Sequence, residues 1–501
     1  MKKINITIRL FMLMLLASSC VNDLGNYNYI SPEELLPISV SGLKDTTVII
    51  NTELNITPVI ANMDNEGRYE YLWFVTPTTT AGSLPVRDTL AQTKNLSVKI
   101  QKAPTSYYLT FMVLDKKKDI YAHQRITLTV AGTTITSGYY VLKDSNDETD
   151  FDYITKTGEM TPNVLKEVVG GMQLKGKAVQ VEYQSSYYCH ENVLPDGTVQ
   201  LLTGQRAMHI LSDKDMKTFN AATMLLFKDY ESEFYNFNEV VERTPQHFRV
   251  GSDANYLING NKVHNCYTMA SHTGRFGYAV GSISSRVHSQ ALMQSQNMIV
   301  FDKTTRSFGL AAGSGTTINP YNNNTVNPDM LSPSNMEYDI VQLIDKGVNG
   351  QGYALLRHIT NGKHIIARIV STSGAAYPFT VLYDVPAGCQ MPTAPVVAAP
   401  RDVEGIYFAT DNRLQSYKLG DVIPKEVVLR TFPAGETISF IKNIYVSGTT
   451  GFNRLFVLTN STSGWKLYVF NMIGSTEEFS EEPVEVFSGT GTARYVMFRN
   501  S

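Results

Sequence analysis

A strand–turn–strand pattern recurs along most of the chain and limits what the chain can fold into. The units begin at residues 138, 197, 254, 297, 351, 405 and 453. A spacing of roughly 45 to 60 residues, with about four strands per unit, is typical of β-propeller blades. Asn259-Gly260 and Asn361-Gly362 supply residues that tight hairpin turns favour. We therefore predict a seven-bladed β-propeller over residues 138–501, with stacked β-sandwiches as the alternative.

The end of the repeat array is informative, because the last strand, "ARYVMFRN", has no complete unit of its own. We expect it to lie beside the first blade and close the ring, which would remove an exposed sheet edge. Helical periodicity is found only over residues 162–171 and 213–227, and both segments are expected to decorate propeller loops.

One segment within the repeats, residues 311–339, is rich in Asn, Pro, Gly and Ser and is predicted to be a long loop. Long loops inside compact domains are usually functional or disordered. The candidate ligand- or partner-binding residues are Tyr321, Asn322, Asn323 and Asn324. A mobile crossover between blades is the alternative reading of this loop.

The region before the repeats, residues 35–131, contains short alternating strands such as "YEYLWFV" and "QRITLTVAG". This pattern predicts a β-sandwich of about 100 residues, so the whole chain is expected to be all-β. The stretch "YYLTFMVLDKKKDIYAHQRITLTV" resembles the last two strands of a PKD domain, a sandwich with immunoglobulin-like topology. Trp73 is expected in its core, and residues 132–137 are expected to be a linker.

The first 19 residues have the pattern of a secretory signal peptide, with Lys2, Lys3 and Arg9 before a short apolar run. That run is about half of the roughly 20 residues that a membrane-spanning helix needs. It ends in "LASSC", which resembles a bacterial lipobox, so Cys20 is the expected lipidation site. Residues 20–34 then form a spacer between the lipid and the fold, and a plain signal peptide is the alternative.

Composition excludes several classes of function. The formal net charge is -3, and loss of the three positive charges of the signal peptide makes it -6, which does not suit nucleic-acid binding. Cys189, Cys266 and Cys389 permit at most one disulfide, and whether any of them pair stays open. Their wide spacing also lacks the pattern of a structural zinc site.

Motifs for catalysis and metal binding are incomplete. "CHENVLP" has Leu194 where a zinc-protease motif requires its second His. "DSNDETD", residues 144–150, has Thr149 where an EF-hand loop needs Gly, and is expected to be a solvated hairpin turn. We therefore expect no cofactor, no metal and no catalytic residues, which argues against an enzyme.

The lipobox, the "NYNY" spacer, the PKD-like module and the phrase "GYYVLKD" together resemble the PKD-like lipoproteins of Bacteroidetes. The resemblance implies an outer-membrane lipoprotein, facing the cell exterior, beside a SusC-type TonB-dependent transporter and its SusD-type lipoprotein. The implied role is a non-catalytic binding and docking subunit in nutrient import. Oligopeptides are slightly favoured over glycans as cargo, because that family is often encoded near proteases. The alternative is a surface enzyme, built on the propeller, that cleaves glycan or peptide before import.

Overall fold

A computed structural model describes residues 38–500, except 64–67, 79–85, 134, 194–198, 240–241, 269–273, 326, 328–329, 373–374, 421, 447–451 and 475. The predicted signal peptide, Cys20 and the spacer lie outside the described residues. Helix is limited, in the part described, to one π-helical turn, Val164–Val168, and the short 3-10 turns Phe237–Glu239 and Met391–Thr393. The all-β prediction is confirmed. None of the helices in the described ranges has the length and apolar character needed to cross a membrane.

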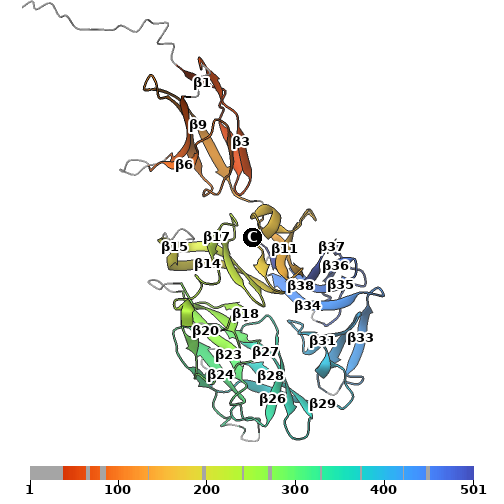
Figure 1. Cartoon of the computed structure of the whole chain (residues 1–501). Coiled ribbons are helices and arrows are strands. Elements are labelled where there is room, and N and C mark those ends of the chain that lie inside the picture. Colours follow the sequence, from red (N-terminus) through yellow and green to blue (C-terminus); the bar gives the residue numbers. More distant parts are fainter. Residues whose placement is uncertain are drawn as a thin grey trace, which may run out of the picture. The chain divides into compact units, whose positions relative to one another are not determined.

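The chain divides into two compact units (Figure 1). The first extends to Thr129 and the second begins at Val130, except that the short segments Val48–Thr52 and Lys99–Thr105 group with the second unit.

The first unit is a sandwich of antiparallel strands. Its main sheet has the order β2-β9-β8-β5-β6 and consists of β2 (Thr46–Ile49), β9 (Ile120–Ala131), β8 (Ser106–Asp115), β5 (Tyr69–Pro77) and β6 (Asp88–Ala91). Two smaller pairs accompany it, β1 (Ser39–Ser41) with β4 (Val59–Ala61) and β3 (Glu53–Ile56) with β7 (Leu96–Lys99). Trp73 is fully buried against Phe111, with ring centroids 4.4 Å apart, and its indole N–H donates to the carbonyl oxygen of Thr93 at 3.0 Å. The predicted core position of Trp73 is confirmed.

The second unit contains seven antiparallel sheets in chain order. The first sheet contains β10 (Gly138–Ser145), β11 (Glu148–Thr155), β12 (Met160–Thr161), β13 (Leu174–Lys175) and the C-terminal β38 (Thr492–Arg499). The second contains β14 (Ala178–Val193), β15 (Val199–Ser212), β16 (Met216–Asn220) and β17 (Leu226–Lys228). The third contains β18 (Pro245–Val250), β19 (Ala254–Asn259), β20 (Lys262–Tyr267) and β21 (Ala279–Val280).

In each of the other four sheets, strands that are neighbours in the sequence are also neighbours in the sheet. The fourth contains β22 (Leu292–Gln294), β23 (Asn297–Asp302), β24 (Ser307–Ala312) and β25 (Ile318–Pro320). The fifth contains β26 (Tyr338–Asp345), β27 (Gln351–His358), β28 (His364–Val370) and β29 (Phe379–Val385). The sixth contains β30 (Val396–Ala398), β31 (Gly405–Thr410), β32 (Arg413–Lys418) and β33 (Glu426–Thr431). The seventh contains β34 (Thr437–Val446), β35 (Phe452–Ser461), β36 (Gly464–Asn471) and β37 (Glu485–Gly489).

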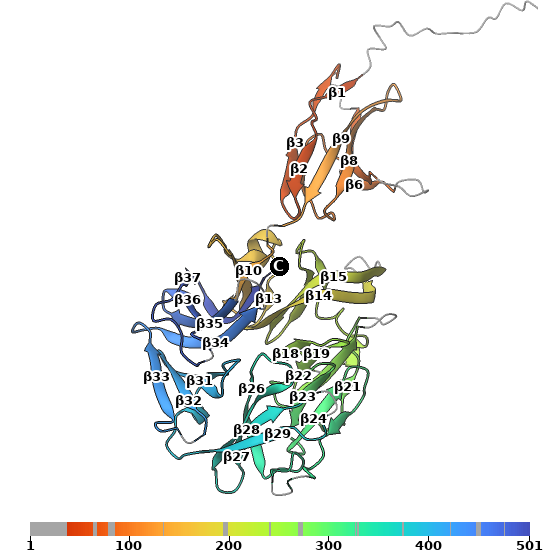
Figure 2. The same ribbon diagram turned by 180° about the vertical axis from the view of Figure 1, so that it is seen from behind.

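Hydrophobic clusters join each sheet to the next, so the seven sheets follow one another around a ring (Figure 2). The last cluster joins the seventh sheet to the first, where Phe456 and Leu467 pack against Val141 and Val496. The strand β38 also pairs with β10 from Gly138 to Asp144. The predicted closing strand is therefore confirmed, and it covers the edge of β10 that would otherwise be open.

Each repeat unit seen in the sequence begins at or near the second strand of a sheet. Six of the seven starts lie at or near the beginning of a second strand, namely β15, β19, β23, β27, β31 and β35. The remaining start, residue 138, begins β10, whose inner neighbour is β38, so β10 also occupies the second place in its sheet. Several second strands are buried almost continuously; β19, for example, is buried at all six positions. The first strands of several sheets are short, which makes them weaker signals.

Local predictions in this unit had mixed outcomes. Residues 145–148 form the expected hairpin turn, because Ser145 pairs with Glu148 and the two residues between them have positive φ angles. The hairpin at Asn259-Gly260 is also present, although its two turn residues are Gly260 and Asn261.

Two predictions about secondary structure were wrong. Residues 213–227 form β16 and part of β17 instead of a helix, because pairing with β15 buries side chains on both faces of β16. Residues 311–339 are not one long loop, since they include the end of β24, all of β25 and the start of β26.

Candidate functional site

A cavity of about 320 Å³ lies where the inner strands of the seven sheets meet. Its wall includes residues from β14, β18, β26, β30, β34 and β38, together with Gln290 and Ala291 just before β22. We call it the inner cavity. Its titratable side chains are His247, Arg249, Asp345, Lys346, Lys442 and Tyr495, and its amide side chains are Gln180, Gln246, Gln290, Gln342 and Asn443. The wall is therefore polar and can make many hydrogen bonds.

Arg249 and Asp345 form an ion pair inside the inner cavity, joining β18 of the third sheet to β26 of the fifth. Burial disfavours the charge of Arg249, but the nearby Asp345, Glu182 and Tyr495 nevertheless keep its pKa above the ordinary value. The two opposite charges satisfy each other, so this pair adds no net charge to the cavity.

His247 lies beside this pair and is held neutral. Burial, followed by the positive charge of Arg249, lowers the pKa of His247 well below its usual range. Its Nε2 accepts a hydrogen bond from Nε of Arg249 at 3.1 Å, and the ring also hydrogen-bonds the backbone of Ala291. Because its hydrogen-bonding capacity is used in this way, His247 is not positioned as a general base.

The two lysines of the inner cavity differ in their partners. Lys346 points its ammonium group at Glu404, with Nζ 3.1 Å from Oε1, and at the carbonyl oxygen of Val403 at 2.9 Å. Glu404 also pairs with Arg368 at 2.9 Å, so the charge of Lys346 belongs to a structural network.

Lys442, on β34, has no carboxylate within ion-pair distance anywhere in the described ranges. Its closest polar contact is the hydroxyl of Tyr495 on β38, 3.4 Å from Nζ. The same tyrosine, outweighing the opposing effect of burial, raises the pKa of Lys442 above its ordinary value. Among the described residues, the inner cavity thus presents one half-buried positive charge that is not in a direct ion pair, with amide side chains in the same wall.

The residues predicted from the sequence lie elsewhere, and none of them lines the inner cavity. Tyr321 is buried in the core between the fourth and fifth sheets, and its hydroxyl lies 2.8 Å from Oγ of Ser371. Asn322 and Asn323 are exposed, and Asn324 is half-buried. The side-chain oxygens of Asn323 and Asn324 accept hydrogen bonds from Ser332 and from the backbone of Asn327. A ligand-binding role for these four residues stays a prediction.

One feature of the sequence could have identified residues of the inner cavity, namely charged side chains in predicted strands. Arg249, Asp345 and Lys442 are charged residues within or at the end of strands that also carry several apolar side chains, "PQHFRV", "YDIVQLID" and "TISFIKNIYV". A charge in such a strand needs either an ion-pair partner or a water-filled space. These three strands are far apart in the sequence. They line the same inner cavity only because the seven sheets close into a ring.

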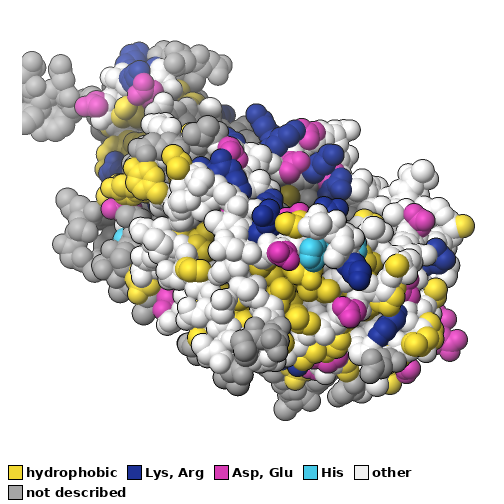
Figure 3. All heavy atoms as spheres, turned by 90° about the horizontal axis from the view of Figure 1, so that it is seen from below, with side chains coloured by type: hydrophobic (Ala, Val, Ile, Leu, Met, Phe, Trp, Pro, Cys, Tyr) yellow, Lys and Arg dark blue, Asp and Glu magenta, His cyan; other side chains and the backbone are white. Residues whose placement is uncertain are grey.

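Metal-ligating clusters and single-sign charged patches do not mark a further site in the described part of the chain. Within the ranges that the structure describes, no group of three His, Cys, Asp or Glu side chains could hold a metal ion. In the face drawn in Figure 3, basic and acidic side chains are interspersed, with hydrophobic groups between them.

Comparison with known proteins identifies the N-terminal part of the chain. The model of the PKD-like family matches residues 20–178, which reaches past the sandwich to the beginning of β14. No curated protein matches the chain significantly.

Two solved structures share a weak likeness with the chain. One is PorZ, a surface component of the type-IX secretion system of Porphyromonas gingivalis, with 10% identity, a TM-score of 0.30, and coverage of 73% of this chain and 53% of PorZ. The other is the extracellular domain of the one-component system BT4673 of B. thetaiotaomicron, with 11% identity, a TM-score of 0.33, and coverage of 63% of this chain and 39% of that one. The chain thus spans about half or less of the length of each.

These likenesses are too low to support an argument about the second unit, and its assignment to the propeller class stays a prediction. The family match is specific to the first part of the chain and agrees with the sandwich around Trp73. Residues 20–178 of this all-β chain are thus similar to the PKD-like family.

Proposed function

We propose that the chain is a non-catalytic binding subunit of a nutrient importer at the bacterial outer surface, anchored by a lipid on Cys20. Its partners are a SusC-type transporter and a SusD-type lipoprotein, and its cargo is an oligopeptide in preference to a glycan. The anchor rests on the sequence "LASSC", and the partners rest on the resemblance to PKD-like lipoproteins.

The observation that carries the binding role is Lys442 in the inner cavity. A half-buried ammonium group without a carboxylate partner favours an anion that would replace the water around it. The free carboxylate of a peptide, at its end or on an acidic side chain, has the required charge. The amide groups of Gln290, Gln342 and Asn443 could bond to the polar backbone of such a ligand.

The proposal that the subunit does not catalyse a reaction has a physical basis in the same cavity. Arg249, Asp345 and Lys346 are each held in ion pairs, and the cavity's histidine is neutral and hydrogen-bonded. A general base or nucleophile needs a free group within reach of the substrate. Measured turnover of a peptide or glycan polymer by the purified chain would instead support the alternative of a surface enzyme.

The proposed docking leads to an expected result in the native bacterium. The tagged full chain, solubilised in mild detergent at low salt, should recover a SusC-type transporter and a SusD-type lipoprotein in near-stoichiometric amounts. Membrane anchoring raises the effective concentration of the partners, so complexes should survive gentle extraction. A tagged, unrelated outer-membrane lipoprotein serves as the control. Recovery of the chain alone, under conditions that keep the transporter bound to its own lipoprotein, would contradict the docking role.

A further inference from the structure

A second cavity, of about 350 Å³, opens at the outer part of the third sheet, away from the inner strands. Its walls come from β20, from the residues around β21, and from the segment between Asp229 and Glu239 that precedes β18. We call it the rim pocket. It shares no lining residue with the inner cavity. Its size falls within the range typical of small-ligand pockets.

The floor of the rim pocket combines an aromatic ring with a histidine. Phe234 is buried and meets the ring of His264 edge-on, with centroids 5.3 Å apart. Nδ1 of His264 lies 3.0 Å from the carbonyl oxygen of Gly277. Because a carbonyl oxygen only accepts, Nδ1 must carry the ring proton, which leaves Nε2 as an acceptor in the neutral ring. Burial lowers the pKa of His264 below its ordinary value, so the ring stays neutral at pH 7.

Nε2 of His264 has no hydrogen-bond partner among the residues that the structure describes, and it is not one of the buried polar atoms left unpaired there, so solvent in the rim pocket can reach it. A neutral imidazole nitrogen that carries no proton accepts a hydrogen bond from water or from a ligand. The floor of the rim pocket therefore favours a ligand that carries a hydrogen-bond donor.

The mouth of the rim pocket exposes large hydrophobic side chains. Tyr235 is 58% exposed, Tyr278 is 63% exposed and Ile283 is 89% exposed. The amide nitrogen of Asn236 donates to the hydroxyl of Tyr278 at 2.5 Å, which ties the two walls together. Scattered exposed hydrophobics need no explanation, but three around one cavity are typical of a binding site. Glu242 and Lys262 add one charge of each sign to the lining.

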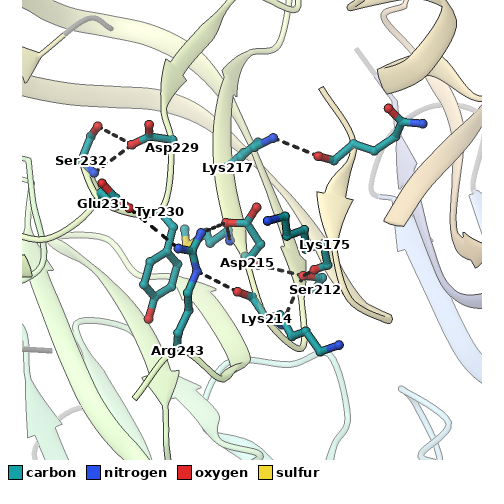
Figure 4. Close-up of polar contacts among 12 residues, drawn as sticks. Lys175, Ser212, Lys214, Asp215, Lys217, Asp229, Tyr230, Glu231, Ser232 and Arg243 are labelled. Carbon is teal, nitrogen blue, oxygen red and sulfur yellow. Dashed lines mark hydrogen bonds and ion pairs between the residues drawn. The ribbon is translucent and has the colours of Figure 1, made fainter. Parts of the chain in front are cut away.

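The wall that carries Phe234 and Tyr235 is held in place by Arg243 (Figure 4). Its Nη2 pairs with Oδ1 of Asp215 at 2.8 Å, and its Nε donates to the carbonyl oxygen of Lys214 at 2.9 Å. The guanidinium also lies over the ring of Tyr230, 4.4 Å from the centroid. Tyr230 in turn packs against Phe234, with centroids 5.2 Å apart. The pocket is therefore built before any ligand arrives, which reduces the entropy lost on binding.

We propose that the rim pocket binds a peptide through an aromatic side chain that bears a hydrogen-bond donor, the phenol of tyrosine or the indole of tryptophan. The ring packs against Phe234 and between Tyr235 and Tyr278, and its O–H or N–H donates to Nε2 of His264. The two charges in the lining, Glu242 and Lys262, complement the opposite charges of a peptide. This site is independent of the inner cavity and of the importer.

The test compares N-acetyl-tyrosinamide with its O-methyl ether, which keeps the ring and removes the donor. Binding of each to the full chain is measured by ligand-observed NMR. We expect the phenol to bind about tenfold more tightly than the ether, because the ether cannot donate a hydrogen bond to Nε2 of His264. N-acetyl-tryptophanamide should bind, and N-acetyl-glucosamine, as a sugar probe, should not.

Two variants locate the binding. His264→Phe keeps an aromatic floor and should bind phenol and ether equally. Ile283→Asp, at a position that is 89% exposed, should weaken the binding of both probes at least fivefold. Ile359→Asp is the matched control, since Ile359 is also exposed, at 45%, and does not line the pocket. The proposal is overturned if the wild-type chain does not distinguish phenol from ether, if Ile283→Asp behaves like Ile359→Asp, or if only the sugar binds.

Discussion

A chain that ends after Gly491 is expected not to fold its second unit cooperatively. This truncation removes β38, which pairs with β10 along seven residues and places Ala493 and Val496, both fully buried, in the cluster between the first and seventh sheets. The edge of β10 would lose its backbone partners, and Phe456 and Leu467 would face water. The expected loss is comparable with the whole stability of a domain, about 5–15 kcal/mol.

The matched control ends after Arg499 and removes only the last two residues. Lys156 then loses its exposed hydrogen bonds to Asn500, which should have little effect on stability. Urea unfolding of both truncated chains, followed by circular dichroism, measures the difference. A cooperative transition near the wild-type midpoint in the chain that lacks β38 would show that closure does not hold the ring together.

Replacement of Asp152 by Ala is expected to destabilise the second unit by about 3–5 kcal/mol, the usual cost of breaking a buried ion pair. Asp152 lies on β11, and its Oδ1 pairs with Nζ of Lys143 at 2.7 Å, with both side chains almost fully buried. Its Oδ2 accepts the indole N–H of Trp465 from the seventh sheet at 3.2 Å. Removal of the carboxylate leaves a buried ammonium group and a buried indole N–H without their acceptor.

Asp339→Ala provides the control for this prediction. Asp339 also lies on a strand and pairs with an arginine, Arg357, but at 4.0 Å and with about half of each side chain exposed. Exposed pairs of this kind contribute about 0–1 kcal/mol. Urea unfolding at pH 7 should separate the two variants clearly. Equal stability of the Asp152→Ala and Asp339→Ala chains would mean that the buried carboxylate of Asp152 does not stabilise the second unit.

Local sequence patterns predict much of the fold. The segments whose structure was predicted wrongly depend on contacts with residues far away in the sequence. Alternating strands predicted the sandwich around Trp73, and the recurring strand–turn–strand pattern predicted seven units, which correspond to the seven sheets of the second unit. The closing strand was predictable because "ARYVMFRN" had no unit of its own. Residues 213–227 were predicted to be helical from their periodicity, but pairing with β15 and burial on both faces overrode that preference.

The inner cavity was harder to predict, for a physical reason. Arg249, Asp345 and Lys442 lie on three sheets that are nearly 100 residues apart along the chain, and only the closed ring brings them to one space. The polar neighbours of Tyr321 in the sequence favour a binding role for it, but its aromatic ring packs in the core between the fourth and fifth sheets. An Asn-rich setting describes the surface near a residue and says little about where its own side chain points.

Binding of hexapeptides to the inner cavity tests the proposed function most directly. A hexapeptide library without Asp or Glu is offered to the full chain as free acids and, in parallel, with amidated C-termini, and the retained peptides are identified and quantified by mass spectrometry. We expect the wild-type chain to retain the free acids at least about tenfold better, because a charge-assisted hydrogen bond contributes about 1.5–3 kcal/mol. Lys442→Met should remove this preference, whereas Lys363→Met, at an exposed hairpin position outside the cavity, should keep it. The retained peptides should be uncleaved. Equal retention of acids and amides by the wild-type chain, an unchanged preference in Lys442→Met, or recovery of peptide fragments would contradict the account.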